Sequence, residues 1–208
     1  GAQLGVSPTD EYLIVIFVTP VGPYFKGGFS ATNYVITREY DRAAPQGTGK
    51  YKVGGNYGAS LRAHVQASRE GYSCEFYLDP RQKKYIEECG AANFIAVKGN
   101  KYITPESDSI LPSITNKSLQ QLALDMGMEV EVRKIPVEEL STFDEAGACG
   151  TAAVISPIGY IDDKENGKRY TFSQDGQPGP VFRKLYEKLR NIQYGIEPDI
   201  HNWVTVIE

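Results

Sequence analysis

The pattern of the chain changes from strands to a helix at Gly47-Thr48-Gly49-Lys50-Tyr51-Lys52-Val53-Gly54-Gly55-Asn56-Tyr57. In this stretch a lysine stands directly before a Gly-Gly turn that opens a helix. Glycines let the backbone approach a ligand closely or adopt positive φ. A lysine held against such a turn can act as a nucleophile if its pKa is lowered, although a solvated lysine is the simpler interpretation. Lys50 and Lys52 would share one face of a strand, so periodicity does not choose between them.

Strand patterns precede this stretch. Residues 12–19 form a continuous apolar run rich in β-branched and aromatic side chains, which predicts a strand covered on both faces. Residues 20–23, Pro-Val-Gly-Pro, end the run, and residues 32–37 predict a second strand. Residues 41–49 read as a polar loop.

Helices and strands are mixed after the stretch. Apolar spacing predicts three helices, ending at Gly71, Gly127 and Gly195. Strand patterns occur at residues 75–78, 93–97, 128–135, 151–155 and 204–207. Helix length and spacing do not fit a strict βαβ alternation, so we expect an α+β domain.

Three further segments have the composition of ligand sites. Ile86-Glu87-Glu88-Cys89-Gly90-Ala91-Ala92-Asn93 places acids before small residues and a strand, so that one carboxylate can point into a cavity. Leu111-Pro112-Ser113-Ile114-Thr115-Asn116 precedes an amphipathic helix, whose N-cap would be Ser or Thr and whose first amides form an anion site. Ala148-Cys149-Gly150-Thr151-Ala152-Ala153 leaves backbone amides open beside a hydroxyl. Taken singly, none is specific, and a strand end, a helix cap or a packed turn explains each more simply.

Taken in order, the four segments supply a lysine, a carboxylate, a helix start and a second amide turn. Pyridoxal phosphate requires this set, because it needs an amine for its aldehyde, a partner for its pyridine nitrogen and donors for its phosphate. We therefore expect pyridoxal 5'-phosphate as the cofactor.

The stretch Lys52-Val53-Gly54-Gly55-Asn56-Tyr57 resembles the Lys-x-Gly-Gly-Asn-Tyr signature of branched-chain amino acid aminotransferases, which are fold-type IV pyridoxal phosphate enzymes. The resemblance extends over nearly the whole chain. It includes residues 20–25, 88–94, 110–115, 150–153 and 192–195. It implies a distorted β-barrel-like mixed sheet with helices packed outside, namely the cofactor-binding large domain of the family.

The resemblance also implies a role for individual residues. Lys52, not Lys50, would bond to the cofactor and move the substrate's α-proton, and Tyr57 would hydrogen-bond the cofactor's phenolic oxygen. Glu88 would pair with the pyridinium nitrogen, which leaves Glu87 as a solvated neighbour. The remaining roles concern anions and the substrate. The resemblance implies that Ile114, Thr115 and Thr151 bind the cofactor phosphate. It also implies that the amides of Thr151 and Ala152 bind the substrate carboxylate and that Tyr24 contacts the substrate side chain.

The activity implied by the resemblance is transfer of the amino group of leucine, isoleucine or valine to 2-oxoglutarate by a ping-pong route, in a homodimer. We expect residues 1–28 to form a first strand and an interdomain-type loop, and residues 29–208 to form the pyridoxal phosphate-binding domain. The family's smaller N-terminal domain is absent from the sequence. Two alternatives stay open: a cofactor-binding domain without turnover, and another fold-type IV activity such as D-amino acid transamination.

Composition excludes several other classes. The formal net charge of -4 gives no basic excess for nucleic acid or an anionic membrane surface, and no apolar run approaches the length of a membrane span. Three scattered cysteines are a poor disulfide framework, which favours the reducing cytoplasm. With two histidines and no paired cysteine motif, no zinc or iron site is expected.

Overall fold

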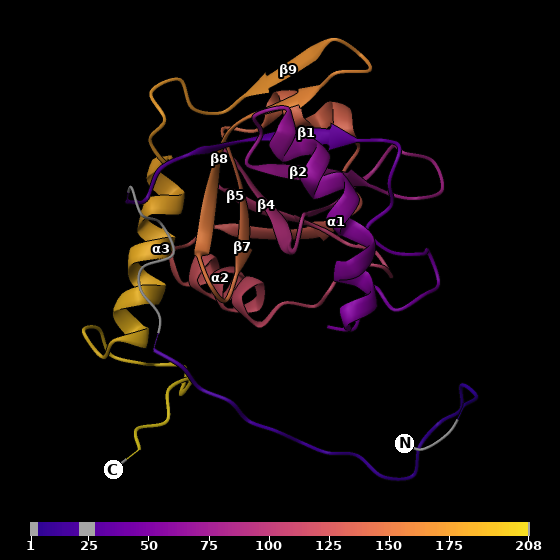
Figure 1. Cartoon of the computed structure of the whole chain (residues 1–208). Helices are drawn as coiled ribbons and strands as arrows, with labels where there is room; N and C mark the ends of the chain where they lie inside the picture. The colour runs from indigo at the N-terminus through magenta and orange to yellow at the C-terminus, as the bar shows by residue number, and fades with distance from the viewer. Residues whose placement is uncertain (1–3, 21–27, 208) are drawn as a thin grey trace.

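A computed structural model describes residues 4–20 and 28–207, and its centre is a nine-stranded mixed sheet (Figure 1). Its elements are, in chain order, β1 (Thr32–Thr37), α1 (Gly54–Arg69), β2 (Cys74–Leu78), β3 (Ile86–Cys89), β4 (Ala92–Lys98), β5 (Lys101–Pro105), α2 (Ile114–Asp125), β6 (Glu129–Arg133), the 3₁₀ turn η1 (Val137–Thr142), β7 (Glu145–Gly150), β8 (Val154–Asp163), β9 (Lys168–Thr171) and α3 (Pro180–Gln193).

The sheet closes on itself. Neighbouring strands follow the order β3-β2-β1-β8-β7-β4, and β4 also pairs with β3, so these six strands form a closed ring. Strands β5 and β6 extend the sheet beyond β4, and β9 pairs with β8. The pairs β1–β2, β1–β8 and β5–β6 are parallel and the others are antiparallel. The expected α+β class, with a barrel-like mixed sheet and flanking helices, is confirmed.

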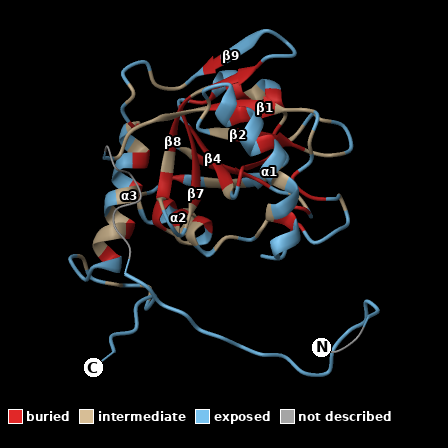
Figure 2. Ribbon diagram, viewed as in Figure 1, coloured by how far each residue is buried: buried red, intermediate tan, exposed pale blue. Residues whose placement is uncertain are grey.

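Two apolar clusters hold the barrel and its helices together. The first fills the ring with side chains from all six of its strands, including Ile36, Phe76, Ile86, Phe94, Ala148 and Ile161. The second joins α2 and α3 to the outside of the sheet and includes Ile95, Tyr102, Leu119, Leu122, Ile155 and Leu185. Buried residues accordingly concentrate on the strands and on the inward faces of the helices (Figure 2).

Helix α3 is fixed to the sheet by a buried carboxylate. Glu145 of β7 accepts hydrogen bonds from the amides of Val181 and Phe182 at 2.8 and 2.9 Å, so it satisfies two of the free donors at the helix start. A Cβ at Gly179 would lie 2.0 Å from the Glu145 carboxyl carbon, which explains the glycine before Pro180. Burial raises the pKa of Glu145 despite these two donors.

Between its two ends, the chain forms most of the predicted helices and strands. The strand predicted at 32–37 is β1, and the three helices end where predicted, since Gly71, Gly127 and Gly195 have φ of +84°, +77° and +69° just beyond them. The short strand predicted at 151–155 is wrong in its start, because residues 151–153 form a turn and β8 begins at Val154.

Both ends of the chain differ from prediction. Residues 12–19 form no strand, and their apolar side chains are exposed, as for Leu13 at 89% and Ile16 at 90%. Nothing in the described part of the chain covers this segment, which extends away from the folded body (Figure 1). The strand predicted at 204–207 is also wrong, since these residues are exposed and unpaired. A β pattern predicts pairing only where a partner strand lies alongside.

None of the helices in the described residues has the length and apolar character needed to cross a membrane.

Candidate cofactor site

The site is centred on the hairpin of β3 and β4. Glu88 is 2% exposed and lies opposite Asn93 in the ladder between the two strands. The Asn93 amide donates to Glu88 Oε1 at 2.8 Å and to the carbonyl oxygen of Leu111 at 2.9 Å. The Leu111 carbonyl therefore ties the segment before α2 to the end of β4 that faces the Glu88 carboxylate.

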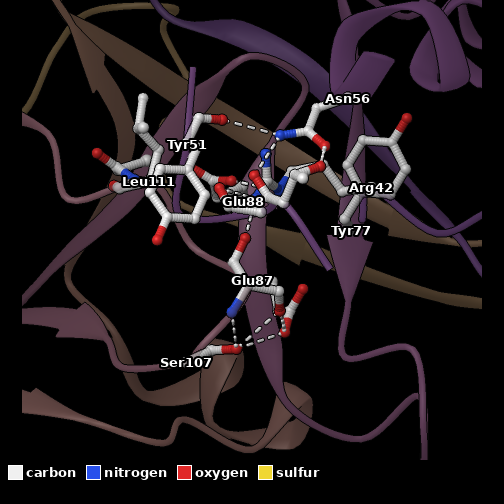
Figure 3. Close-up of polar contacts among 12 residues, drawn as sticks. Arg42, Tyr51, Asn56, Tyr77, Glu87, Glu88, Ser107 and Leu111 are labelled. Carbon is white, nitrogen blue, oxygen red and sulfur yellow. Dashed lines mark hydrogen bonds and ion pairs between the residues drawn. The ribbon is translucent and has the colours of Figure 1, made fainter. Parts of the chain in front are cut away.

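Arg42 is a site residue that the sequence analysis missed. It is 5% exposed, and its guanidinium forms an ion pair with Glu88 and donates to the carbonyl oxygens of Gly49 and Ser109 (Figure 3). A buried arginine whose planar donors bridge two loops and one carboxylate holds all three in a fixed arrangement. In the sequence it stands in a polar loop that gave no such signal, because its partners lie up to 67 residues away.

The charge of Glu88 is incompletely compensated. Burial raises its pKa to about 8, although Arg42 and the Leu111 amide act in the opposite direction. The Oε2 atom has no hydrogen-bond donor besides its ion-pair contact with Arg42 Nε, and among the described residues Glu87 Oε2 likewise lacks a donor. A buried carboxyl group in this condition can hold a proton near neutral pH or share one with a ligand.

Glu87 is a correction to the sequence analysis, which expected a solvated side chain. It is 2% exposed, and its Oε1 accepts hydrogen bonds from the hydroxyls of Ser107 and Ser109 at 2.7 and 2.6 Å. Successive strand residues point to opposite faces, so Glu87 turns toward Ser107 while Glu88 faces Arg42 (Figure 3). The two acids are thus separated by the strand and have different partners.

The lysine loop is built around Asn56, in the first turn of α1. Its amide donates to the carbonyl oxygens of Thr48 and Tyr51 at 2.8 and 2.9 Å, and its Oδ1 accepts from the Thr48 hydroxyl at 2.8 Å. These bonds fold residues 48–51 back over the helix start, so the Gly-Gly-Asn segment serves as a clamp for the loop before Lys52.

The two lysines of this loop differ in their contacts. Neither lies in a strand; Lys50 forms an exposed ion pair with Asp108 at 2.6 Å. Lys52 is exposed and forms no ion pair within the described residues. Because Arg42 holds the Gly49 carbonyl three residues earlier, the Lys52 loop and Glu88 are joined through one side chain.

Replacing Asn56 with alanine removes all three bonds of this clamp. We expect the free energy of unfolding in urea to fall by about 1–2 kcal/mol, because Asn56 is buried and two partly buried bonds to carbonyl groups are lost. Trypsin should also cleave faster after Lys52 in N56A. The matched control is Asn100→Ala, which removes a single exposed bond to the carbonyl of Gly127. Equal tryptic rates for N56A and wild type would contradict the clamp.

Two backbone segments near Asn93 offer anion donors. Ser113 is the N-cap of α2, as expected, and its Oγ accepts from the amide of Asn116 at 3.2 Å. The amides of Ile114 and Thr115 have no acceptor among the described residues. A helix start with free amides favours an anion such as phosphate.

The second segment is the turn between β7 and β8. Thr151 and Ala152 are exposed at its tip, and Gly150 faces Ala92 at the start of β4. The turn ends at Val154, whose φ of +63° is rare for a β-branched residue. Such backbone is kept only where surrounding packing enforces it, and Val154 is 2% exposed.

The predicted site residues are therefore partly brought together. Glu88, the start of α2 and the turn at Thr151 meet at the Asn93 end of β4, since Asn93 pairs with both Glu88 and Cys149. Tyr57 is half-buried in the first turn of α1. Tyr24 lies outside the described residues. The set fits pyridoxal phosphate chemically, because a buried carboxyl of raised pKa is linked through Arg42 to the loop of an exposed lysine and through Asn93 to the segment before the free amides of α2.

A family model described as "Amino-transferase class IV" matches residues 2–161. The branched-chain-amino-acid aminotransferases of Haemophilus influenzae and Helicobacter pylori are 47% and 49% identical to the chain. The alignments cover 100% and 98% of this chain but 62% and 59% of those proteins. The chain thus spans about three-fifths of the length of these curated relatives.

Solved structures of branched-chain amino acid aminotransferases also resemble this chain in fold. A branched-chain amino acid aminotransferase of Escherichia coli superposes with a TM-score of 0.76 at 30% identity, over 89% of this chain and 59% of that one. A branched-chain amino acid aminotransferase of a T.th. strain, solved with pyridoxamine 5'-phosphate, has a TM-score of 0.76 at 27% identity, over 89% and 58% of the two chains.

Proposed function

Since the chain belongs to the class IV aminotransferases, we propose that it carries the pyridoxal phosphate site of a branched-chain amino acid transaminase. The observation that carries this proposal is the buried pair of Glu88 and Arg42, which joins a carboxyl group of raised pKa to the loop of an unpaired lysine. Because burial raises the pKa of Glu88, this carboxyl group can hold a proton near neutral pH, as a partner for a ring nitrogen must.

When bound, pyridoxal phosphate supplies the electron sink that lets the Cα–H bond of an amino acid break. Glu88 holds the proton of the pyridine nitrogen, and Tyr57 donates to the phenolic oxygen. Lys52 would hold the cofactor through its amine and would serve as general base and acid for the proton on the substrate's Cα.

The phosphate and the substrate have their own donors in this proposal. The amides of Ile114 and Thr115 and the hydroxyl of Thr151 bind the phosphate, and the amides of Thr151 and Ala152 bind the substrate carboxylate. Tyr24 contacts the substrate side chain. Support for these roles comes from the free amides at the start of α2 and the exposed tip of the β7–β8 turn.

The remaining parts of the proposal concern the longer protein. Leucine, isoleucine and valine are its amino donors and 2-oxoglutarate its acceptor, as the names of the relatives suggest for the donors. We propose a homodimer, and a cytoplasmic location supported by three free cysteines. Residues 1–28, described in part, then connect this domain to the rest of the enzyme.

A single-turnover assay tests the proposed reaction. The chain is loaded with cofactor, freed of excess and mixed with a stoichiometric amount of L-leucine or D-alanine, and the oxo acid formed is measured. We expect an oxo acid from L-leucine alone, and none from the K52A variant. Oxo acid from D-alanine in preference to L-leucine would favour a D-amino acid transaminase. Retained cofactor with no oxo acid from either donor would favour a binding domain without turnover.

A further inference from the structure

A second group of ligating side chains lies between α1 and β2. Within residues 4–20 and 28–207, His64, Cys74 and Glu75 form the one set of three histidine, cysteine or acidic side chains whose ligand atoms all lie within 4.8 Å of one another. His64 Nδ1 is 3.0 Å from Glu75 Oε2, and Cys74 Sγ is 3.7 Å from the same oxygen. The proposed cofactor chemistry uses none of the three.

The ligand types and spacings suit zinc. Zinc binds imidazole nitrogen at about 2.0 Å, carboxylate oxygen at about 2.0–2.2 Å and thiolate sulfur at about 2.3 Å. Two ligands in a tetrahedron around the ion are therefore separated by roughly 3.3–3.6 Å. The observed separations of 3.0 and 3.7 Å lie close to these values, so small side-chain shifts would complete the coordination.

The surroundings of the cluster also suit a bound cation. Glu75 is 2% exposed, and its other oxygen accepts a hydrogen bond from the Tyr77 hydroxyl at 3.3 Å, which orients the carboxylate. The His64 side chain is 51% exposed, so an ion has an access route and a position open to water.

We propose that His64, Cys74 and Glu75 bind one Zn²⁺ ion per chain, with water at the fourth position. The alternative is a metal-free network in which the Cys74 thiol donates to Glu75 Oε2 and His64 pairs with the same oxygen. Binding replaces the thiol proton, which is released to solvent, by a sulfur–zinc bond. The ion joins α1, the helix that follows Lys52, to β2, and it lies behind the β3–β4 turn, where Gly90 packs against Cys74.

The full chain, freed of metal by a chelator, is titrated with Co²⁺ and then with Zn²⁺. We expect one Co²⁺ per chain with visible ligand-field bands of tetrahedral geometry and a near-ultraviolet thiolate band, both displaced by Zn²⁺. The variants H64Q and C74S should each weaken binding at least tenfold. Zn²⁺ should raise the melting temperature of the wild type and leave that of H64Q unchanged.

His201→Gln is the matched control, because His201 also contacts a carboxylate, Asp125 at 2.7 Å, but has no cysteine in its group. It should bind metal as the wild type does. His64 is half-exposed, so H64Q should fold, and circular dichroism verifies this for each variant. No thiolate band, or equal affinities for H64Q, H201Q and wild type, would overturn the proposal.

Discussion

Replacing Arg42 with alanine should lower the free energy of unfolding by about 3–5 kcal/mol, because it leaves the Glu88 carboxyl buried without its partner. The same change removes the donor that holds the carbonyl oxygens of Gly49 and Ser109. Arg42→Lys should recover only part of this loss, since a lysine keeps the charge but cannot reach all three acceptors with one planar group. Urea denaturation measures both variants.

The control for Arg42 is Arg169→Ala. Arg169 also pairs with a carboxylate, that of Asp162 at 2.6 Å, but the Arg169 side chain is 55% exposed. Asp162 is buried but keeps the Tyr72 hydroxyl as a donor, so R169A should lose some stability and clearly less than R42A. If R42A and R169A lost the same stability, Arg42 would not be the structural link that joins the lysine loop to Glu88.

Replacing Glu88 with glutamine should weaken the binding of pyridoxal phosphate about 10- to 100-fold, since a hydrogen bond to a charged group contributes about 1.5–3 kcal/mol. Glutamine keeps the size of the side chain and an oxygen for the Asn93 amide, so the fold should persist. Equilibrium dialysis against the cofactor, with visible absorbance as the readout, gives the dissociation constant.

Glu87→Gln provides a matched control one residue away. Glu87 is as buried as Glu88 but faces Ser107 and Ser109, so its replacement should change stability and leave the dissociation constant for the cofactor unchanged. Equal weakening by E87Q and E88Q would show that the effect comes from disturbing β3 and not from the pyridine nitrogen.

The raised pKa of Glu88 also predicts a pH dependence. Its pKa is about 8 in the folded chain against about 4.3 for glutamate in an unfolded chain. The folded state thus binds more protons between these values, and stability must fall as pH rises through that window. The wild type should therefore lose stability relative to E88Q between about pH 4.3 and pH 8. A difference independent of pH would contradict a protonated Glu88.

Local patterns predicted elements whose signals lie within a few residues. The strand at 32–37 and the helix stops at Gly71, Gly127 and Gly195 depend on nearest neighbours and on glycine's tolerance of positive φ, so they were correct. Ser113 as an N-cap belongs to the same class, because its acceptor role spans only three residues.

Elements that depend on distant partners were missed or wrong. Strand β3 reads as a charged segment, and its acids are buried only because Arg42, Ser107 and Ser109 reach them from elsewhere in the chain. Strand β8 contains Pro157 and Gly159, which ordinarily argue against a strand. A register shift at Thr32 and Asn33, opposite these residues, accommodates them. Residues 12–19 have a strong β pattern but no neighbour in the described chain.

In the candidate site, too, local features were predicted and contacts between distant residues were not. The signature around Lys52 and the acid of β3 were identified from sequence, whereas the contacts that connect them were not. Arg42 has no local feature that sets it apart from other arginines. The set of His64, Cys74 and Glu75 was likewise hidden, because His64 is separated from the other two by a helix end and a turn.

The most direct test of the central claim is to add pyridoxal phosphate to the purified chain, record its absorbance before and after borohydride, and map the labelled peptide by mass spectrometry. The account predicts a visible band that borohydride removes, with the reduced phosphopyridoxyl group on Lys52 and not on Lys50. The K52A variant should show neither band nor label. No band, or label scattered over exposed lysines in wild type and K52A alike, would contradict a cofactor site in this chain.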